Sequence, residues 1–308
     1  MRIAVIGAGA MGSIYGGHLS QHNEVYLIDT YGKLVERINT EGLVLEEGGS
    51  SNVYHPRAVQ SAEGLPEMDL VILFVKALYS RAALAGSRAM LGKNTRILTL
   101  QNGSGHEDIL GEFVDREHII IGTTEDNGAV LGLGHVRRGG VGNTNVGMLC
   151  EDREGFLLKL KESFETCGFH VRIHENIQQL IWDKLFTNVS LSAVTGILQV
   201  KMGYISRNES AWQLTSALLH EAVEVAHAMG LLADEAALAE KIRQTSVNSP
   251  EGITSICADL RSGRRTEVDT ISGSVVRAAE RLGIEVPSHR FVVNMVHAME
   301  GRDEESRA

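Results

Sequence analysis

The first half of the chain alternates short apolar runs with segments of helical spacing. Runs at 3–6, 24–28 and 68–76 read as strands, and the segments 11–19 and 33–39 place apolar residues as a helix would. The run at 68–76, M-D-L-V-I-L-F-V-K, is continuous, which is typical of a strand buried on both faces of a parallel sheet. This alternation predicts an α/β domain with a doubly wound sheet.

The pattern continues to about residue 173. Strand-like runs at 119–122, 129–136 and 145–148 are separated by glycine-rich turns and predict a meander that completes the sheet. The remaining predicted elements of this half are strands at 42–45, 53–59, 96–100 and 171–173 and helices at 82–91 and 156–166.

Near residue 174 the strand-like runs give way to helical periodicity. Predicted helices cover 177–198, 212–229, 236–244, 253–261, 268–282 and 291–299. We therefore predict an α/β domain over residues 1–174 and an all-α domain over residues 175–308. Apolar helices such as 212–229 could supply the face of a homodimer.

The first strand leads directly into G-A-G-A-M-G at residues 7–12. In a turn between strand and helix, Gly7 allows the tight turn, Gly9 lets a pyrophosphate approach the backbone, and Gly12 lets helix and strand pack closely. Ala10 and Met11 stand at the start of the helix, where free N–H groups bind a diphosphate. The motif predicts a Rossmann-type domain that binds a dinucleotide.

Asp29 follows the second strand, 17 residues beyond Gly12. A carboxylate at this point can accept hydrogen bonds from both hydroxyls of an adenosine ribose, whereas it would repel a 2′-phosphate. The predicted cofactor is therefore NAD(P)H, with NADH favoured over NADPH.

Composition narrows the classes of partner. The hydrophobic content of 43% and the charged content of 22% are those of a soluble globular protein, and the net charge of −10 argues against nucleic acid. No apolar segment has the roughly 18–20 residues of a membrane span, so we expect a cytoplasmic protein. Three isolated cysteines and scattered histidines predict no metal site.

Two polar residues follow predicted strands of the parallel sheet. Lys76 ends the run 68–76, and Asn102, in Q-N-G, follows the strand 96–100. Because the carboxyl ends of parallel strands line the ligand crevice, both are candidates for contact with cofactor or substrate. The alternatives are that Lys76 caps a strand in solvent and that Asn102 merely belongs to a turn.

A dinucleotide domain joined to a helical domain suggests hydride transfer, in which the second domain supplies a proton donor and substrate anchors. Lys184, Asn188 and Ser192 are spaced i, i+4, i+8 and therefore share one helix face, either a solvent stripe or a buried polar seam. Ser255 shares one face of the predicted helix 253–261 with Asp259. Glu267, in R-R-T-E-V-D, is by spacing alone better explained as a capping residue near a helix N-terminus.

Six ordered motifs together resemble the ketopantoate reductase family, the 2-dehydropantoate 2-reductases, over nearly the whole chain. They are G-A-G-A-M-G at 7–12, V-K-A at 75–77, Q-N-G at 101–103, I-G-T-T at 121–124, W-D-K-L-F-T-N at 182–188 and D-L-R-S-G-R-R-T-E-V-D at 259–269. The resemblance implies reduction of 2-dehydropantoate at C2 to (R)-pantoate by NAD(P)H.

The resemblance also implies roles for single residues. Lys184 would be the general acid that protonates the carbonyl oxygen, and Glu267 would hold substrate and lysine in place. It further places Lys76 and Asn102 at the nicotinamide end of the cofactor, Asn188 and Ser192 beside the substrate, and Ser255 at the substrate carboxylate.

Four positions depart from the family pattern. Asp29 stands where most members have a basic residue, and Ser192, Met202 and Gly252 stand where asparagine is usual. A site with fewer amides discriminates less well for a hydroxyl-bearing substrate.

The chain therefore also resembles the NAD-dependent D-2-hydroxyacid dehydrogenases of the same superfamily, which act on branched or aromatic 2-oxo acids. We place 2-dehydropantoate first and such an oxo acid second. A dinucleotide sensor without catalysis is a third hypothesis, against which the retained Lys184 and Glu267 argue.

Overall fold

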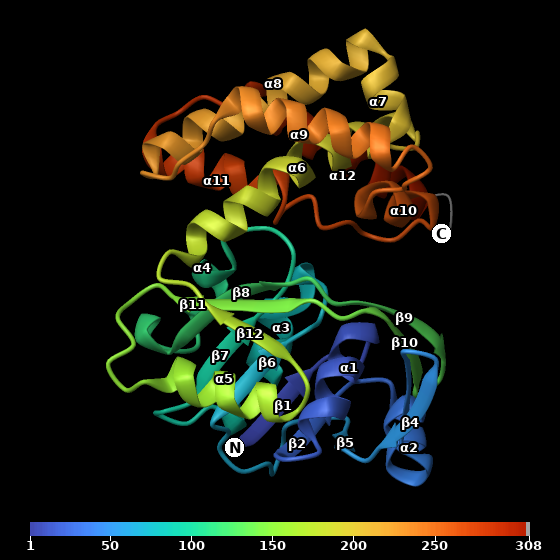
Figure 1. The fold of residues 1–308 in the computed structure, drawn as a ribbon, viewed down its shortest axis with the longest axis vertical. Coiled ribbons are helices and arrows are strands. Elements are labelled where there is room, and N and C mark those ends of the chain that lie inside the picture. The colour runs from blue at the N-terminus through green and yellow to red at the C-terminus, as the bar shows by residue number, and fades with distance from the viewer. Residues whose placement is uncertain (306–308) are drawn as a thin grey trace. The chain divides into compact units, whose positions relative to one another are not determined.

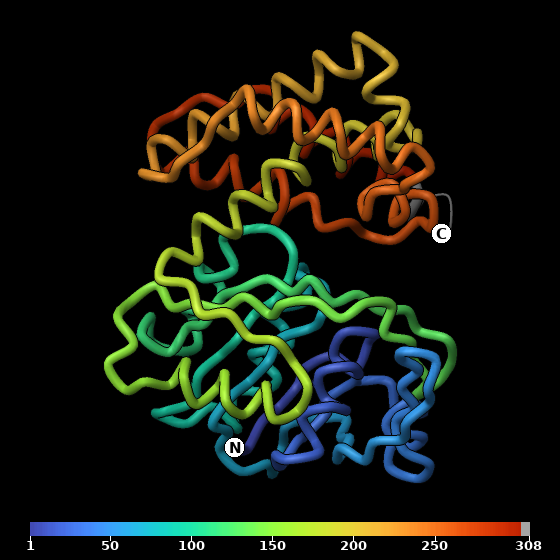
Figure 2. Tube along the Cα trace, in the orientation of Figure 1, coloured from blue at the N-terminus to red at the C-terminus, as the bar shows by residue number. Residues whose placement is uncertain are grey.

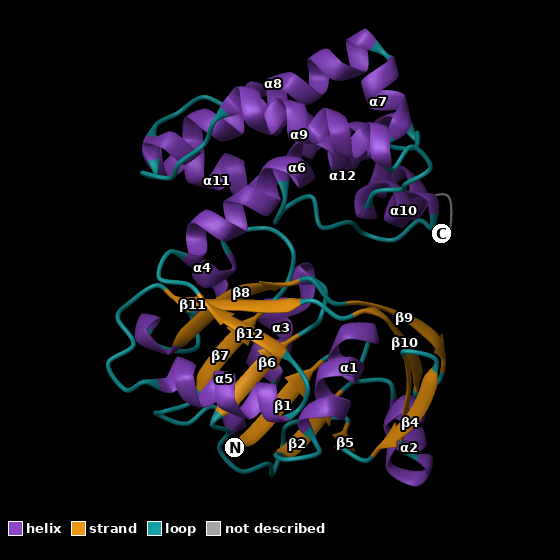
Figure 3. Cartoon of the chain, viewed as in Figure 1, coloured by secondary structure: helices purple, strands orange, loops and turns teal. Residues whose placement is uncertain are grey.

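The computed structural model describes residues 1–305, with side chains through Arg302. It falls into two compact units. The first, here called the Rossmann unit, comprises Met1–Gln101 and His106–Ile177, and the second, the helical unit, comprises Asn102–Gly105 and the chain from Gln178 onward. Strands occur in the Rossmann unit, and the elements of the helical unit are helices (Figure 3).

The main sheet of the Rossmann unit has eight strands in the order β12-β11-β8-β7-β6-β1-β2-β5 (Figure 1). Neighbouring strands are parallel except β8 and β11, which are antiparallel. This order, from β5 to β8, is that of a doubly wound sheet, so the predicted fold class is confirmed. The strands are β1 Arg2–Ile6, β2 Glu24–Ile28, β5 Arg57–Val59, β6 Leu70–Leu73, β7 Arg96–Thr99, β8 Ile119–Thr124, β11 Asn143–Met148 and β12 His170–Ile173.

The helices of the Rossmann unit are α1 Ala10–Leu19, α2 Gly32–Glu41, α3 Ser80–Gly86, α4 His106–Leu110 and α5 Phe156–Thr166. Helix α1 is anchored by Tyr15, whose buried ring stacks on Phe169 with centroids 4.4 Å apart. The Tyr15 hydroxyl lies 3.0 Å from the Thr124 hydroxyl and 2.7 Å from that of Thr144. Burial raises the pKa of the Tyr15 phenol well above its usual value. These contacts fix α1 against strands β8 and β11.

A second sheet of four strands, in the order β4-β3-β10-β9, corrects two predictions. The predicted strand 53–59 is divided at Pro56, so that β4 pairs with β3 here while β5 joins the main sheet. The predicted strand 129–136 is a hairpin that turns at Gly134, where φ is +64°, so the predicted meander in the main sheet is wrong. The strands are β3 Leu43–Glu47, β4 Ser50–Tyr54, β9 Asn127–Gly132 and β10 His135–Gly140.

The helical unit has its own hydrophobic core, separate from that of the Rossmann unit. Trp182 and Phe186 of α6 are fully buried in it, with ring centroids 5.9 Å apart. The long helix α6 has the predicted bounds, and its apolar side chains from Trp182 to Val194 lie in this core. Figure 2 traces the chain from α6 in yellow-green to α12 in red. The helices are α6 Ile177–Leu198, α7 Gly203–Arg207, α8 Glu209–Ala228, α9 Glu235–Asn248, α10 Ser255–Arg261, α11 Ser272–Leu282 and α12 Pro287–Glu305.

Some helix starts were predicted wrongly. The helix expected over 291–299 begins already at Pro287. The helix expected over 268–282 begins only at Ser272. The preceding residues form a turn in which the Glu267 carbonyl oxygen accepts hydrogen bonds from the N–H groups of Thr270 and Ile271, each at 3.1 Å. Glu267 therefore lies in a turn before α11, not in its first turn.

Candidate functional site

The glycine-rich turn joins β1 to α1 as predicted. Gly7 has φ +97°, and a Cβ on Gly12 would overlap the Gly7 carbonyl oxygen, so the fold itself requires both glycines. A Cβ on Gly9, by contrast, would meet no protein atom within 4 Å. Protein packing therefore does not explain this glycine, and the open space beside it fits the close approach of a diphosphate. Ala10 and Met11 begin α1, where the first N–H groups have no partner within the helix.

Asp29 lies at the carboxyl end of β2, directly beside the turn. Its Oδ2 accepts a hydrogen bond from the Ala8 N–H and its Oδ1 one from the Tyr31 N–H, both at 2.9 Å. These two bonds fix the carboxylate, while each oxygen keeps a further lone pair for another donor. Asp29 thus supports the turn and can also meet a ligand hydroxyl.

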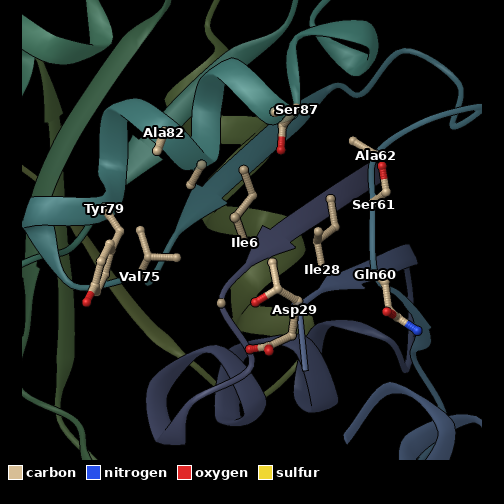
Figure 4. Close-up of a pocket in the computed structure, with 14 residues that line it drawn as sticks. Ile6, Ile28, Asp29, Gln60, Ser61, Ala62, Val75, Tyr79, Ala82 and Ser87 are labelled. Atoms are coloured by element: carbon tan, nitrogen blue, oxygen red, sulfur yellow. The ribbon is translucent and has the colours of Figure 1, made fainter. Parts of the chain in front are cut away.

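A cavity of about 520 Å³ opens beside Asp29 (Figure 4). This volume lies within the range of small-molecule sites. Residues from the ends of β1, β2 and β5 and from helix α3 surround it. The lining residues are Ile6, Gly7, Ile28, Asp29, Thr30, Gln60, Ser61, Ala62, Val75, Tyr79, Ala82, Ala83, Gly86 and Ser87.

Gln60 and Ser61 were not predicted as site residues. They follow β5, which lies beside β2 in the main sheet. The predicted strand 53–59 ends at the same residue, but it joined β5 to β4 and so did not place this strand end beside Asp29. Pro56 in the middle of the predicted strand was the signal that could have separated the two.

Lys76 lies three residues beyond the end of β6, half-buried and directly before a short 3₁₀ helix. Its turn is held by the buried side chain of Gln101, whose Nε2 donates to the Val75 carbonyl oxygen at 2.5 Å. Gln101 Oε1 also accepts from the Thr99 hydroxyl at 2.8 Å. Asn102 in Q-N-G was the predicted site residue, whereas the preceding Gln101 is the residue whose side chain links the ends of β6 and β7.

Asn102 itself belongs to the helical unit. The N–H of Ser104 donates to the Thr270 carbonyl oxygen at 2.9 Å. Gly103 has φ +98°, and a Cβ there would overlap the same Thr270 oxygen. The loop that carries Asn102 is thus attached to the turn that carries Glu267, a relation that no sequence spacing indicated.

The polar face of α6 is neither wholly exposed nor wholly buried. Lys184 is exposed, Asn188 is half-buried and Ser192 is buried. Beyond Ser192, the Thr195 hydroxyl lies 2.7 Å from that of Thr254. Thr254 caps α10 and directly precedes Ser255, which is exposed, so this end of the α6 face meets the start of α10.

Two of the departures from the family pattern contact each other. The Met202 N–H donates to the Gly252 carbonyl oxygen at 2.9 Å. A Cβ on Gly252 would overlap Cε of Met202. The methionine methyl group therefore occupies the space that a side chain at position 252 would need, so the two substitutions form a matched apolar pair.

The predicted residues thus fall into two sets. The Rossmann unit holds Gly7, Gly9, Ala10, Met11, Gly12, Asp29 and Lys76, and the helical unit holds Asn102, Lys184, Asn188, Ser192, Ser255 and Glu267. Their roles remain predictions. Across the residues that the structure describes, no helix is long and apolar enough to cross a membrane.

Two family models match the chain. The model described as ketopantoate reductase PanE/ApbA matches residues 3–151, and the model of the C-terminal part of the same family matches residues 176–300. Together they cover most of both units.

Curated relatives match over nearly their full length. A 2-dehydropantoate 2-reductase of Pyrococcus horikoshii is 32% identical over 302 residues, covering 97% of this chain and 98% of the relative. One from Streptococcus pyogenes serotype M6 is 29% identical with the same coverage.

Solved structures agree in fold. D-mandelate dehydrogenase in a ternary structure with NADH and anilino(oxo)acetate is 31% identical, with a TM-score of 0.87 over 99% of this chain and 100% of that chain. A PanE/ApbA family ketopantoate reductase from Ralstonia eutropha JMP134 is 29% identical, with a TM-score of 0.88 and the same coverage. The resemblance drawn from the motifs is confirmed: the chain belongs to the ketopantoate reductase PanE/ApbA family of NAD(P)-binding oxidoreductases.

Proposed function

We propose that the protein transfers a hydride from NADH to C2 of a 2-oxo acid and releases a 2-hydroxy acid. The observation that carries this proposal is Asp29, a carboxylate fixed between the glycine-rich turn and the cavity. There it would accept hydrogen bonds from the ribose hydroxyls of NADH and repel the 2′-phosphate of NADPH. The turn from Gly7 to Gly12 would hold the diphosphate, and bound NADH would supply the hydride.

Lys184 would donate the proton that the reaction requires. As hydride adds to C2, the electron pair of the C=O π bond moves to the oxygen, which then needs a proton. An ammonium group directed at this oxygen stabilises the developing negative charge and then gives up one proton from Nζ. Glu267 would hold substrate and lysine in place, with Asn188 and Ser192 beside the substrate and Ser255 at its carboxylate. Lys76 and Asn102 would contact the nicotinamide end of the cofactor.

The first candidate substrate is 2-dehydropantoate, with (R)-pantoate as product. Two related proteins, one from Pyrococcus horikoshii and one from Streptococcus pyogenes, are named 2-dehydropantoate 2-reductase and support this candidate.

The second candidate is a branched or aromatic 2-oxo acid without a terminal hydroxyl. The contact of Met202 with Gly252 favours it, because a methyl group offers no hydrogen bond to a substrate hydroxyl. D-mandelate dehydrogenase, whose structure holds NADH and anilino(oxo)acetate, supports it as well.

Steady-state kinetics distinguish the two candidates. We would compare kcat/KM for 2-dehydropantoate, 2-oxoisovalerate, 2-oxoisocaproate and phenylglyoxylate, each with NADH and with NADPH. A preference for 2-dehydropantoate of about 100-fold, or about 2.7 kcal/mol, supports the first candidate. A preference for a hydroxyl-free acid supports the second, and no reduction of any oxo acid contradicts the proposal.

A further inference from the structure

The turn that carries Glu267 is held from outside by helix α12. Glu300 of α12 is only 9% exposed, and its Oε1 accepts a hydrogen bond from the Thr266 N–H at 2.7 Å. A buried carboxylate is costly unless its oxygens find donors, so this bond specifies one position for the backbone just before Glu267.

His297 lies one turn earlier on the same helix and joins Glu300 to the other side of Glu267. Its Nδ1 lies 3.0 Å from Glu300 Oε2, and its Nε2 lies 3.0 Å from Asp269 Oδ1. Only a doubly protonated imidazole can donate both of these hydrogen bonds. Burial lowers the pKa of His297, but the hydrogen bonds to the two carboxylates outweigh it and raise the pKa above the ordinary value.

These contacts flank Glu267 on both sides in the sequence. Thr266, the residue before it, is bound to Glu300, and Asp269, two residues after it, is bound to His297. Arg277 of α11 adds a further bond, because its Nη1 donates to the Asp269 carbonyl oxygen at 2.9 Å. The Glu267 carbonyl oxygen closes the turn by accepting from Thr270 and Ile271.

We propose that His297 and Glu300 are positioning residues that fix the Glu267 turn in the geometry used for reduction of the 2-oxo acid. The inference rests on the proposed function, in which Glu267 holds substrate and lysine. Thr270 lies in the same turn, and its carbonyl oxygen accepts a hydrogen bond from the Ser104 N–H. By fixing this turn, His297 and Glu300 would therefore also help to fix the loop that carries Asn102.

The test is a double-mutant cycle on the full chain. His297→Ala, Glu267→Gln and the double variant are compared with the starting protein for kcat and KM of the best 2-oxo acid with NADH, and for the melting temperature. Arg290→Ala is the matched control, because Arg290 Nη1 links α12 to Glu280 of α11 at 2.8 Å on the surface, away from the turn. His297→Gln keeps one amide donor and serves if the alanine variant does not fold.

We expect His297→Ala to lower kcat/KM by about 10-fold or more, since small displacements of a positioned group are costly, while Arg290→Ala leaves it unchanged. In the Glu267→Gln background, the same change should cost less than about 2-fold, because the residue through which it acts is already impaired. His297→Gln should fall between.

Other results would overturn the inference, and they separate it from the proposed function. If His297→Ala and His297→Gln keep normal turnover while Glu267→Gln impairs it, His297 is not a positioning residue and the proposed function stands. If His297→Ala costs the same factor in both backgrounds, its effect does not pass through Glu267. If Glu267→Gln itself has normal turnover, the proposed role of Glu267 fails, and the inference fails with it.

Discussion

The backbone N–H of Ser104 donates a hydrogen bond to the carbonyl oxygen of Thr270 at 2.9 Å. This bond joins a loop that follows strand β7 to a turn more than 160 residues later in the chain. Gly103 allows the approach, because any side chain there would overlap the Thr270 oxygen. Asn102 and Glu267, which the family resemblance assigns to cofactor and substrate, are therefore held by one local structure.

Gly9 and Gly12 of the glycine-rich turn are needed for different reasons, one for cofactor binding and one for folding. Gly9 has φ −67°, which alanine adopts readily, and its Cβ would meet no protein atom. We expect Gly9→Ala to keep the melting temperature and to raise the Kd for NADH by about 10-fold or more, because the methyl group enters the space of the diphosphate. Gly12→Ala should instead lower the melting temperature, since its Cβ overlaps the Gly7 oxygen. Unchanged NADH binding by a folded Gly9→Ala variant would contradict the assigned site.

Asp29 should control the choice of cofactor. Asp29→Asn removes the negative charge at nearly constant size and should lower kcat/KM with NADH relative to NADPH by about 10-fold. Because the Asp29 carboxylate also accepts from Ala8, thermal unfolding should be recorded in parallel. An unchanged ratio of the two cofactors would show that the charge at position 29 does not select between them.

Lys184 should be required for turnover but not for cofactor binding. Lys184→Ala removes the proposed proton donor, and general acid catalysis typically contributes about 100-fold to 10,000-fold. We expect kcat to fall by a factor in this range, while the Kd for NADH, measured by fluorescence titration, stays within about 2-fold. Lys184→Ala with near-normal kcat would exclude the lysine as the general acid.

Met202 and Gly252 should behave as a pair in stability. Gly252→Ala places a methyl group against Met202 Cε, and because the end of a methionine side chain can move, we expect a cost of about 1 kcal/mol, at the low end for overpacking. In a Met202→Ala background only the Ser249 carbonyl oxygen, 3.0 Å from the added Cβ, remains close, so the same change should cost less. Urea unfolding of the two single variants and the double variant gives the coupling free energy, and additive effects would refute the contact.

A buried histidine predicts the pH dependence of stability. Burial lowers the pKa of His289 from 6.5 to about 4, and its Nε2 lies 2.9 Å from the Leu218 carbonyl oxygen, consistent with a neutral ring that donates there. Between these pH values the unfolded chain binds a proton that the folded chain does not.

Stability should therefore fall as the pH drops from about 6.5 toward 4, by at most about 1.4 kcal/mol per pH unit from this group. His289→Gln keeps an N–H donor without the titration and should show a smaller fall. Denaturant unfolding at pH 7 and at pH 5 gives the free energy of unfolding at each pH. If this free energy falls equally in the starting protein and in His289→Gln, the histidine is excluded as the source of the fall.

Much of the fold could be predicted from hydrophobic spacing. Continuous apolar runs identified β1, β2 and β6, because each run is too short for a typical helix and such runs are typical of strands buried on both faces. Helix α6 was predicted with its observed bounds. The errors in the strands came from short interruptions, because Pro56 and Gly134 each divide a run that looks like one strand.

The candidate site could be predicted only in part. Gly7, Gly12 and Asp29 follow local rules that relate sequence to backbone geometry, and the structure places them together. Gln101 and Glu300 carry no such local signal, because their partners lie far away in the chain. Contacts of that kind depend on tertiary packing, which spacing along one segment does not encode.

The separate hydrophobic cores have a consequence for how the sequence of such a chain can evolve. A volume change in one core is not compensated by the other, so the two halves can accumulate substitutions independently and could be exchanged between relatives as modules. The four residues Asn102–Gly105 are the exception, because they are encoded within one half and packed with the other. A chimera that replaces the helical half would inherit a mismatched loop unless this tetrapeptide is transferred with it.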